Sequence, residues 1–272
     1  MQDILIKYMM NKTTIIRFLN SLNKLEGKKK EYRSKSKLPV YLNDVLIGLL
    51  LSDGYLERTS PTSGVRLTVS FGAKHSLYLQ HLYDLFEPYT NTGPTSVHVV
   101  NRKTETNHKV IRFKTVSLPQ LVDYHKLFYK SNSEGKLIKI VPHNIEELMT
   151  PIVLAHLIMG DGNLKLPDEI IRIYTNSFTK EEVELLSLAI AKKLNILNKV
   201  VHDRNNQYML TISKNQLPLV RELIKAYMHP SMYYKLGLES VNLSSFEEEL
   251  KKLPELNQFG SDCYDYKDIF NK

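Results

Sequence analysis

The sequence predicts an α+β protein built from two αββαββα subdomains that follow one another in a single chain. The first observation is a nine-residue pattern that occurs at residues 46–54 and again at 154–162, apolar until it ends in a small residue, an aspartate and a glycine. The second is that both copies are followed by the same order of strand-like and helix-like segments. The third is the separation of the two aspartates, 161 − 53 = 108 residues, which indicates an internal duplication.

The apolar part of each copy predicts a buried helix, because it is too short to span a bilayer. We refer to these two as the motif helices. The closing residues, Gly54 and Gly162, are of the kind that follows a helix C-terminus. If the motif helices pack side by side, they bring Asp53 and Asp161 together. Paired carboxylates in a basic protein indicate divalent metal and phosphate chemistry.

The other elements follow from hydrophobic periodicity, caps and turn residues. Asn43 is predicted to cap the first motif helix, and Thr150 followed by Pro151 to begin the second. Thr179 and Glu182 form a capping box. In the first subdomain we expect strands over 55–58 and 65–71, a helix over 75–89, a hairpin over 97–100 and 110–116, and a helix over 118–129. In the second we expect strands over 163–166 and 170–176, a helix over 179–194, a hairpin over 199–203 and 207–213, and a helix over 217–227.

The ends of the chain lie outside the repeat. Residues 1–40 hold ten Lys or Arg against three acids. Within them, residues 15–25 predict a short amphipathic helix, and residues 28–37 predict a mobile arm that either touches phosphates or is a solvated extension with no role. We therefore expect a basic extension at 1–40, a first subdomain at 41–138, a second at 139–238 and a peripheral tail at 239–272.

Composition and charge narrow the function. The 272 residues are 42% hydrophobic, enough for a core, and the formal net charge of +8 indicates a polyanionic partner, nucleic acid first and an anionic membrane surface second. A merely basic soluble protein is the alternative. The single cysteine, Cys263, excludes an internal disulfide and a cysteine-based zinc site. A membrane-surface protein needs a long amphipathic basic helix, and residues 1–40 are too polar for one, so we expect no membrane partner.

These residues together resemble the LAGLIDADG homing endonucleases in their single-chain, two-motif form. The resemblance covers roughly residues 41–238 and is nearest to the yeast mitochondrial omega-intron endonuclease subgroup. Besides the two motifs, three stretches carry it, at 139–144, 176–184 and 230–236. Two motif copies, each followed by two hairpins, make the signal specific.

The resemblance implies a fold in which the motif helices pack at a pseudo-twofold axis above a saddle of antiparallel hairpins. It places divalent metal, Mg²⁺ or Mn²⁺, at Asp53 and Asp161. Lys139 and Lys235 then stand beside the metals, one from each subdomain, where they polarise water or phosphate. Ser52, Gly54 and Gly160 are expected to belong to the metal site together with the two aspartates.

Small residues at the helix interface fit this packing, namely Gly48, Ser52, Ala155 and Gly160. The sequence departs from the family pattern in two respects. An acid of the pattern that is not a metal ligand is replaced by Leu51 and by Met159. His156 stands where the pattern has a small residue, so we expect asymmetric packing there and interpret His156 as an interface histidine rather than a ligand.

Recognition of DNA sequence is expected from the hairpins, because a two-stranded ribbon fits the major groove of B-DNA. Alternation along each strand would turn polar residues to the groove and apolar residues to the helices. The candidates in the first subdomain are Arg58, Arg66, Thr68, Ser70, Arg102, Lys103, His108, Arg112 and Lys114. Those in the second are Lys165, Arg172, Tyr174, Asn176, His202, Arg204, Asn206, Gln207 and Tyr208.

The leading interpretation is therefore a site-specific double-strand DNA endonuclease that acts as a monomer on a long asymmetric duplex and is encoded and used in the mitochondrion. The alternative is an intron-encoded RNA maturase on the same fold, with intron RNA as partner. A third interpretation, a DNA-binding protein with degenerate catalysis, predicts loss of an acid or a central lysine, and neither is lost. Two retained acids favour the nuclease, since RNA binding does not require them.

Overall fold

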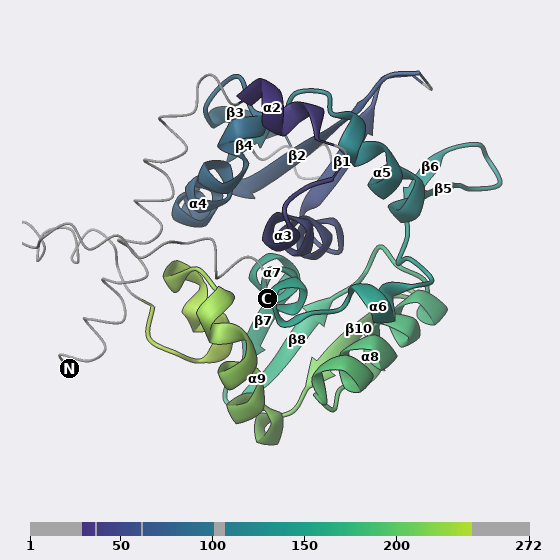
Figure 1. Cartoon of the computed structure of the whole chain (residues 1–272). Helices are drawn as coiled ribbons and strands as arrows, with labels where there is room; N and C mark the ends of the chain where they lie inside the picture. The colour runs from purple at the N-terminus through teal and green to yellow at the C-terminus, as the bar shows by residue number, and fades with distance from the viewer. Residues whose placement is uncertain (1–28, 36, 61, 101–106, 241–272) are drawn as a thin grey trace, which may run out of the picture. The chain divides into compact units, whose positions relative to one another are not determined.

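The computed structural model describes residues 29–35, 37–60, 62–100 and 107–240, which belong to one compact unit. This unit contains two four-stranded antiparallel sheets, each with its own helices. The motif helices, α3 (Val40–Leu50) and α7 (Pro151–Asp161), lie side by side between the sheets (Figure 1). The predicted α+β class and the order of elements are confirmed.

The first sheet has the strand order β1-β2-β4-β3, so its two hairpins join through β2 and β4. Its elements after α3 are β1 (Gly54–Arg58), β2 (Val65–Gly72), η2 (Ala73–His75), α4 (Ser76–Phe86), η3 (Glu87–Tyr89), β3 (Thr95–Val100), β4 (Asn107–Lys114), η4 (Pro119–Leu121) and α5 (Val122–Phe128). The η elements are single turns or short runs of 3-10 helix.

The second sheet has the matching order β7-β8-β10-β9. A short helix, α6 (Ile145–Leu148), precedes α7. The elements after α7 are β7 (Gly162–Lys165), β8 (Ile170–Tyr174), α8 (Lys180–Leu194), β9 (Lys199–His202), β10 (Tyr208–Ile212), η5 (Lys214–Gln216), α9 (Leu217–Ile224), η6 (Lys225–Tyr227) and η7 (Pro230–Leu236).

The strand register repeats between the sheets. Gly54 pairs with Val69 in the first, and Gly162 pairs with Ile173 in the second. The two glycines are 162 − 54 = 108 residues apart and their partners 173 − 69 = 104, so the second hairpin is four residues shorter than the first between these paired positions. The duplication inferred from the motif spacing is therefore also a duplication of strand pairing.

The motif helices pack closely because small residues face each other. A Cβ placed on Gly48 would lie 2.6 Å from the Cβ of His156 and 2.7 Å from the carbonyl oxygen of Val153. A Cβ on Gly160 would lie 2.5 Å from the Ser52 Oγ. Such distances are shorter than van der Waals contact, so the two backbones can approach only with glycine at these positions.

Two helix starts agree with the sequence and one does not. Thr150 caps α7 through a hydrogen bond from the Val153 N–H, and the capping box of Thr179 and Glu182 opens α8. Asn43 does not cap α3, which begins three residues earlier at Val40. The Asn43 side chain instead donates to Asp44 and accepts from the Tyr124 hydroxyl, so a tertiary network replaced the expected cap.

The closing glycines also have a different role from the one expected. Gly162 has an extended backbone, φ −81° and ψ 150°, and both it and Gly54 begin a strand rather than a left-handed helix cap. A Cβ on Gly54 would lie 2.9 Å from the carbonyl oxygen of Leu49, and one on Gly162 would lie 2.5 Å from that of Ile158. Glycine is needed here because the chain passes directly from helix to strand against the last helical turn.

The basic stretch at 28–37 is partly a packed helix, which corrects the expectation of a mobile arm. Helix α2 (Lys29–Ser34) lies against η3, with an ion pair between Lys29 and Glu87. Arg33 donates to the carbonyl oxygens of Pro88 and Thr90 at 2.9 and 2.8 Å. These two cations are therefore used inside the fold. The predicted helix at 15–25 and the tail from 241 lie outside the described residues.

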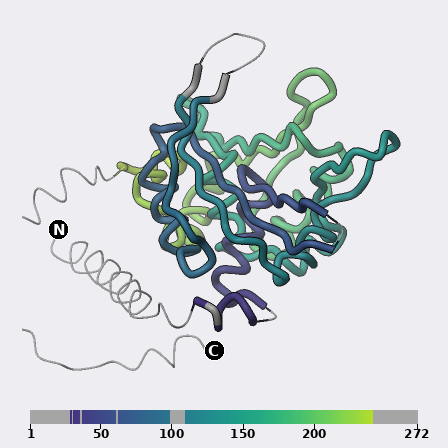
Figure 2. Tube along the Cα trace, turned by 90° about the horizontal axis from the view of Figure 1, so that it is seen from above, coloured from purple at the N-terminus to yellow at the C-terminus, as the bar shows by residue number. Residues whose placement is uncertain are grey.

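A small hairpin between the subdomains was not expected from the sequence. Strands β5 (Tyr129–Ser131) and β6 (Leu137–Lys139) form it, and it extends from the rest of the unit in both views (Figure 1, Figure 2). The hairpin ends at Lys139 and so delivers this residue to the motif helices. None of the described helices is long and apolar enough to cross a membrane.

Candidate active site at the ends of the motif helices

The structure brings Asp53 and Asp161 together. Asp161 is the last residue of α7, and Asp53 follows the final turn of α3 directly before β1. A Cβ on Gly160 would lie 3.0 Å from the Asp53 Oδ2, which places the Asp53 carboxylate against the end of the partner helix. Asp53 is exposed and Asp161 is partly exposed, so both remain accessible to a ligand.

The pKa values of both carboxyl groups are raised. Desolvation raises the pKa of Asp161 to about 7, and the negative charge of Asp53 adds to the shift. The pKa of Asp53 is raised as well, chiefly by desolvation. Lys139 and Lys235 oppose both shifts without cancelling them. A pair of neighbouring carboxyl groups with raised pKa values has the chemistry of a site where a divalent cation can replace protons.

Lys139 and Lys235 lie at equivalent points beside this pair. The Lys139 Nζ donates to the carbonyl oxygens of Ser52 and Gly54, at 2.6 and 3.0 Å. The Lys235 Nζ donates to those of Met159 and Gly160, at 2.5 and 2.7 Å. Each ammonium therefore satisfies carbonyl groups at or just beyond the C-terminal end of a motif helix, where the helix dipole favours positive charge.

Burial makes both lysines weaker bases than usual. It lowers the pKa of Lys139 to about 8 and that of Lys235 to about 8, against the opposing attraction of the two aspartates. An ammonium has three donors and two are used on the helix ends, so one N–H remains for a ligand. Groups with such pKa values can hold or release a proton near neutral pH.

Three residues that the sequence analysis did not single out lie near this centre. The charges of Lys235 and Lys74 contribute to lowering the pKa of His75 to about 4, after desolvation. Tyr78 is completely buried, and the charge of Asp53 contributes to its raised pKa. The predicted β1–β2 hairpin could have indicated these residues. Gly54 pairs with Val69, so the residues just after β2 return to the helix ends.

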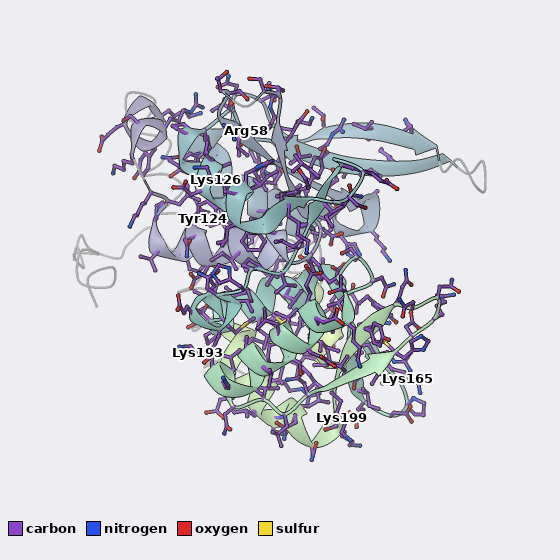
Figure 3. The ribbon with its side chains drawn as sticks, turned by 90° about the vertical axis from the view of Figure 1, so that its right-hand side faces the viewer. Arg58, Tyr124, Lys126, Lys165, Lys193 and Lys199 are labelled. Carbon is purple, nitrogen blue, oxygen red and sulfur yellow. The ribbon has the colours of Figure 1, made fainter. Side chains whose placement is uncertain are left out.

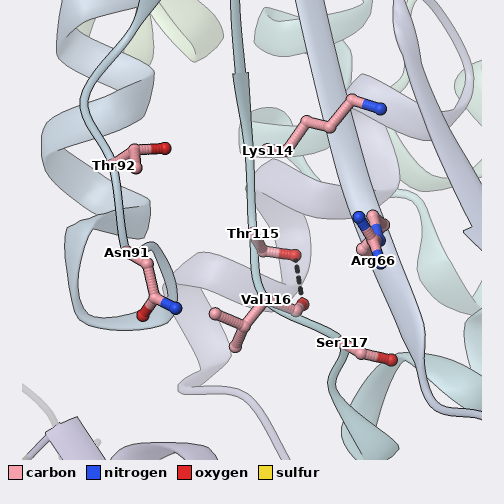
Figure 4. Close-up of a pocket in the computed structure, with 7 residues that line it drawn as sticks. All are labelled: Arg66, Asn91, Thr92, Lys114, Thr115, Val116 and Ser117. Carbon is pink, nitrogen blue, oxygen red and sulfur yellow. Dashed lines mark hydrogen bonds between the residues drawn. The ribbon is translucent and has the colours of Figure 1, made fainter.

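The first sheet presents one polar face. Register and alternation place on it Tyr55, Glu57, Arg66, Thr68, Ser70, Thr95, Arg112 and Lys114. A pocket of about 420 Å³ lies beside this face (Figure 4). It is lined by Arg66, Asn91, Thr92, Lys114, Thr115, Val116 and Ser117.

Glu57 is the one acid among the described strand residues of the two polar faces. Its carboxylate lies 3.2 Å from the Lys114 Nζ and 4.0 Å from the Arg66 Nε. Thr68 lies between Tyr55 and Lys114 in the ladder and is completely buried. The expectation that Thr68 contacts bases is therefore wrong for this conformation, because its neighbours cover it.

The second sheet has a corresponding polar face. Register places on it Asn163, Lys165, Arg172, Tyr174, Lys199 and Thr211, together with the apolar Ile170, Val201 and Met209. Lys165 forms an ion pair with Asp168 in the turn that follows. Asn176 is exposed just beyond β8. Arg204, Asn206 and Gln207 lie in the turn between β9 and β10, where backbone hydrogen bonds join Asp203 to Gln207 and Gln207 to Arg204.

Three candidates lie on the opposite faces. Arg58, labelled in Figure 3, has the parity of Leu56 and donates to the Ser63 carbonyl oxygen at 3.1 Å, and its charge contributes to lowering the pKa of His125 in α5. His202 pairs with Tyr208, on the face shared by the buried Leu210. Arg58, His202 and Tyr208 therefore do not lie on the polar faces with the other candidates, which corrects the expectation that they face the DNA groove. Arg102 and Lys103 lie outside the described residues, as does the side chain of His108.

Comparison with known proteins agrees with this geometry. The model of the LAGLIDADG DNA endonuclease family matches residues 43–220, which include most of α3, all of α7 and both sheets. The chain belongs to the LAGLIDADG DNA endonuclease family. The resemblance inferred from the sequence is therefore confirmed.

Relatives of this LAGLIDADG protein carry two kinds of name. It is 30% identical to the cytochrome b mRNA maturase of Debaryomyces hansenii over 71% of this chain and 72% of that protein. It is 29% identical to the DNA endonuclease I-ChuI of Chlamydomonas applanata over 71% of this chain and 93% of that protein. The match to the cytochrome b mRNA maturase of Saccharomyces cerevisiae, at 26% identity, spans 83% of this chain but only 56% of that protein.

The fold is shared with a solved structure. The homing endonuclease I-WcaI, determined bound to its DNA recognition sequence, matches with a TM-score of 0.68 and 24% sequence identity. The match covers 78% of this chain and 92% of that one. At this identity the comparison establishes the two-sheet fold and its paired central helices.

Proposed function

We propose that this chain is a site-specific DNA endonuclease that cuts both strands of a long asymmetric duplex. The observation that carries the proposal is the pairing of Asp53 with Asp161, each at the end of a motif helix and each with a lysine beside it. A site with two similar halves suits a reaction that must be performed twice, once on each strand. Membership of the DNA endonuclease family supports the same activity.

The donor set fits a hard divalent cation such as Mg²⁺ or Mn²⁺. Asp53 and Asp161 would hold the metal, and among the described residues no group of three or more His, Cys, Asp or Glu side chains offers a complete protein cage. Magnesium sites of this kind use one or two carboxylates, and phosphate oxygens and water complete the coordination. The carbonyl oxygens of Ser52, Gly54 and Gly160 already accept hydrogen bonds from lysines, so we assign them to lysine placement first. The metal would supply charge neutralisation and a more acidic bound water.

In this proposal the lysines supply electrostatic stabilisation from fixed positions. Two hydrogen bonds hold each ammonium at a helix end, so it need not reorganise as negative charge develops on a phosphate. The remaining N–H of Lys139 or Lys235 can donate to a phosphate oxygen or to the attacking water. Because both pKa values are about 8, the neutral amine is also accessible for accepting a proton.

Recognition of the duplex would use the two polar faces. The basic residues Arg66, Arg112, Lys114, Lys165 and Arg172 lie on them. We assign the pocket of Figure 4 to a backbone phosphate, since Arg66 and Lys114 meet amide and hydroxyl groups there. The faces differ in sequence, so the two half-sites are expected to differ. Two fused halves supply the pseudo-twofold geometry, and we propose a monomer on DNA.

Two further proposals accompany this function. Residues 41–138 and 139–238 act as its two subdomains, joined through the motif helices, with the extension and the tail outside them. The protein is made and used in the mitochondrion from an intron reading frame. The resemblance to intron-encoded mitochondrial endonucleases supports the second proposal.

An RNA maturase is the second candidate function, favoured by the names of two relatives. RNA binding does not require a pair of accessible carboxylates flanked by one buried and one partly buried lysine, and this chain has that arrangement. The two functions are therefore separated by whether the activity of the protein depends on the two carboxylates. A maturase would promote intron splicing after both aspartates are replaced by asparagine.

The test is selection from a library of randomised duplexes. The purified full-length chain is incubated with the library in EDTA, bound duplexes are recovered over several rounds, and Mg²⁺ is then added to the enriched pool. The proposal predicts one asymmetric sequence family that is cut in both strands only after the metal is added. Enrichment of a sequence that stays intact in Mg²⁺ and Mn²⁺ would contradict the nuclease and favour a binding protein.

A further inference from the structure

A hydrogen bond between buried side chains joins the two halves of the molecule near the carboxylates. Tyr78 of α4 and His156 of α7 are both completely buried, and the Tyr78 hydroxyl lies 2.8 Å from the His156 Nδ1. The two rings are stacked, with centroids 6.0 Å apart. Tyr78 belongs to the first half and His156 to the second, so this contact ties the first sheet's helix to the second motif helix.

The contact exists on one side of the pseudo-twofold axis only. Because 48 + 108 = 156, Gly48 is the equivalent of His156 in the first half, and glycine has no side chain. The His156 Cβ fills the space beside Gly48, where a second Cβ would come within 2.6 Å of it. The His156 side chain therefore extends from α7, past Gly48 of α3, to Tyr78 of α4. Gly48 cannot make the equivalent contact from α3.

The histidine is neutral and incompletely satisfied. Burial lowers the pKa of His156 to about 3, with a further contribution from His81. Its Nε2 is buried and has no hydrogen-bond partner among the described residues. An unpartnered buried polar atom is destabilising, so a residue that keeps one needs another reason to be present. The Nδ1 contact with Tyr78 provides that reason.

Tyr78 also contacts the segment that carries Lys235. Its ring lies 6.4 Å from that of His229, which caps η7 by accepting from the Ser231 N–H. The His229 backbone N–H donates to the Met159 Sδ of α7 at 3.2 Å. Lys235 lies in the same η7 and donates back to the Met159 and Gly160 carbonyl oxygens. Tyr78 is thus in contact with both pieces whose relative position places the Lys235 ammonium.

We propose that the Tyr78–His156 pair is a positioning device for the Lys235 half of the site, and that it sets how fast one DNA strand is cut relative to the other. The inference rests on the proposed nuclease function. The physical reason is geometric: a displacement on the order of 1 Å of a group that stabilises the transition state costs up to about a hundredfold in rate. The Lys139 half is held by β6 and by its own carbonyl partners, so it should be affected less.

The test measures each strand separately in single turnover on duplex with the selected site, with one end label per strand. Lys139→Met and Lys235→Met first identify which strand depends on which lysine. Tyr78→Phe is then expected to slow the Lys235-dependent strand by about tenfold or more relative to the other, so that nicked product accumulates. Tyr124→Phe is the matched control, because it removes a partly buried hydroxyl contact of 2.6 Å, to Asn43 near the opposite end of α3.

Histidine variants keep the test decisive if Tyr78→Phe folds poorly. His156→Asn retains an amide group near the Nδ1 position and removes the unpartnered Nε2, whereas His156→Leu removes both. The inference predicts a strand ratio near wild type for the asparagine variant and a Tyr78→Phe-like ratio for the leucine variant. Equal slowing of both strands, an identical bias in Tyr124→Phe, or no difference between the asparagine and leucine variants would each overturn it. If wild-type protein cuts neither strand, the nuclease function itself is wrong.

Discussion

Lys139 donates a hydrogen bond of 2.6 Å to the carbonyl oxygen of Ser52, the residue directly before Asp53. Lys235 donates one of 2.7 Å to the carbonyl oxygen of Gly160, the residue directly before Asp161. Because 52 + 108 = 160, Gly160 is the equivalent of Ser52 in the second half. The two lysines are separated by only 235 − 139 = 96 residues, so they reach equivalent carbonyl groups by different routes. This convergence marks the two helix ends as the halves of one site.

Replacement of either lysine should reduce cleavage more than binding. Lys139→Met and Lys235→Met each remove a fixed ammonium, and loss of one such electrostatic donor costs about 3 kcal/mol, or roughly a hundredfold in rate. Affinity for the duplex should change little, since it depends mainly on phosphate contacts along the sheets. The measurement is single-turnover cleavage beside gel-shift titration.

The control for this prediction is Lys126→Met, because Lys126 is an exposed lysine of α5 that pairs with Asp123. It should cut at the wild-type rate. If both central variants also cut at that rate, or lose affinity as far as rate, the two lysines are ordinary phosphate contacts.

Cleavage should fall as the pH is lowered through about 7. Below that pH the Asp161 carboxyl is protonated, since its pKa is raised to about 7, and a protonated carboxyl does not bind metal. Metal and protons compete, so the midpoint of the acid limb should move to lower pH as Mg²⁺ concentration rises. A midpoint that is independent of Mg²⁺ would contradict a carboxylate metal site.

The same raised pKa has a consequence for stability without metal. Between the ordinary pKa of 3.8 and about 7 the folded protein binds more protons at Asp161 than the unfolded chain does. Stability should therefore decrease as the pH rises through this range. Asp161→Asn should flatten the dependence, as measured by urea unfolding at several pH values in EDTA.

Gly48→Ala should destabilise the protein although alanine is the better helix former. Alanine gains about 1 kcal/mol in helix propensity, but its Cβ would meet the His156 Cβ at 2.6 Å, and overpacking of a core costs about 1–3 kcal/mol. We expect a net loss of about 1 kcal/mol in the free energy of unfolding. Gly93→Ala is the control, because no atom lies within 4 Å of its Cβ position. Equal stability of the two variants would show that the motif helices are not in such close contact.

Glu57→Gln should tighten binding to non-specific duplex. The carboxylate neutralises Lys114 and Arg66 on the first polar face and repels phosphate. Exposed pairs of this kind are worth up to about 1 kcal/mol, so we expect roughly two- to fivefold higher affinity at low salt. Glu134→Gln, in the turn of the β5–β6 hairpin, should have no such effect. Unchanged affinity in Glu57→Gln would place this face away from the DNA.

The features that could be predicted from the sequence are those with local signatures. The two motif helices, the capping box at Thr179 and the alternation of Arg66 with Leu67 in β2 each depend on a few adjacent residues. Their order fixed the α+β class, and the spacing of Asp53 and Asp161 fixed the duplication. The lysines were found through resemblance rather than spacing, because the connections that deliver them differ in length.

The features that could not be predicted depend on tertiary packing. Asn43 does not cap a helix, because its side chain accepts a hydrogen bond from the Tyr124 hydroxyl. Arg33 donates hydrogen bonds to backbone carbonyl oxygens in η3 and in the residue after it. The parity of Arg58, His202 and Tyr208 depends on where each strand begins, which periodicity does not fix to within one residue. Tyr78 and His156 meet only because Gly48 leaves a gap between them, a relation that no single segment contains.

The most direct test of the account is the behaviour of Asp53→Asn and Asp161→Asn as separate variants on the selected duplex. Each change keeps the shape of the side chain and removes a negative charge, so affinity in EDTA should stay within a few-fold of wild type while double-strand cleavage in Mg²⁺ is abolished. Gel-shift titration and single-turnover cleavage of the same preparation give both quantities. Full loss of double-strand cleavage with retained binding in both variants is the predicted result. Wild-type cleavage by both variants would contradict the assignment of the paired aspartates as the catalytic centre.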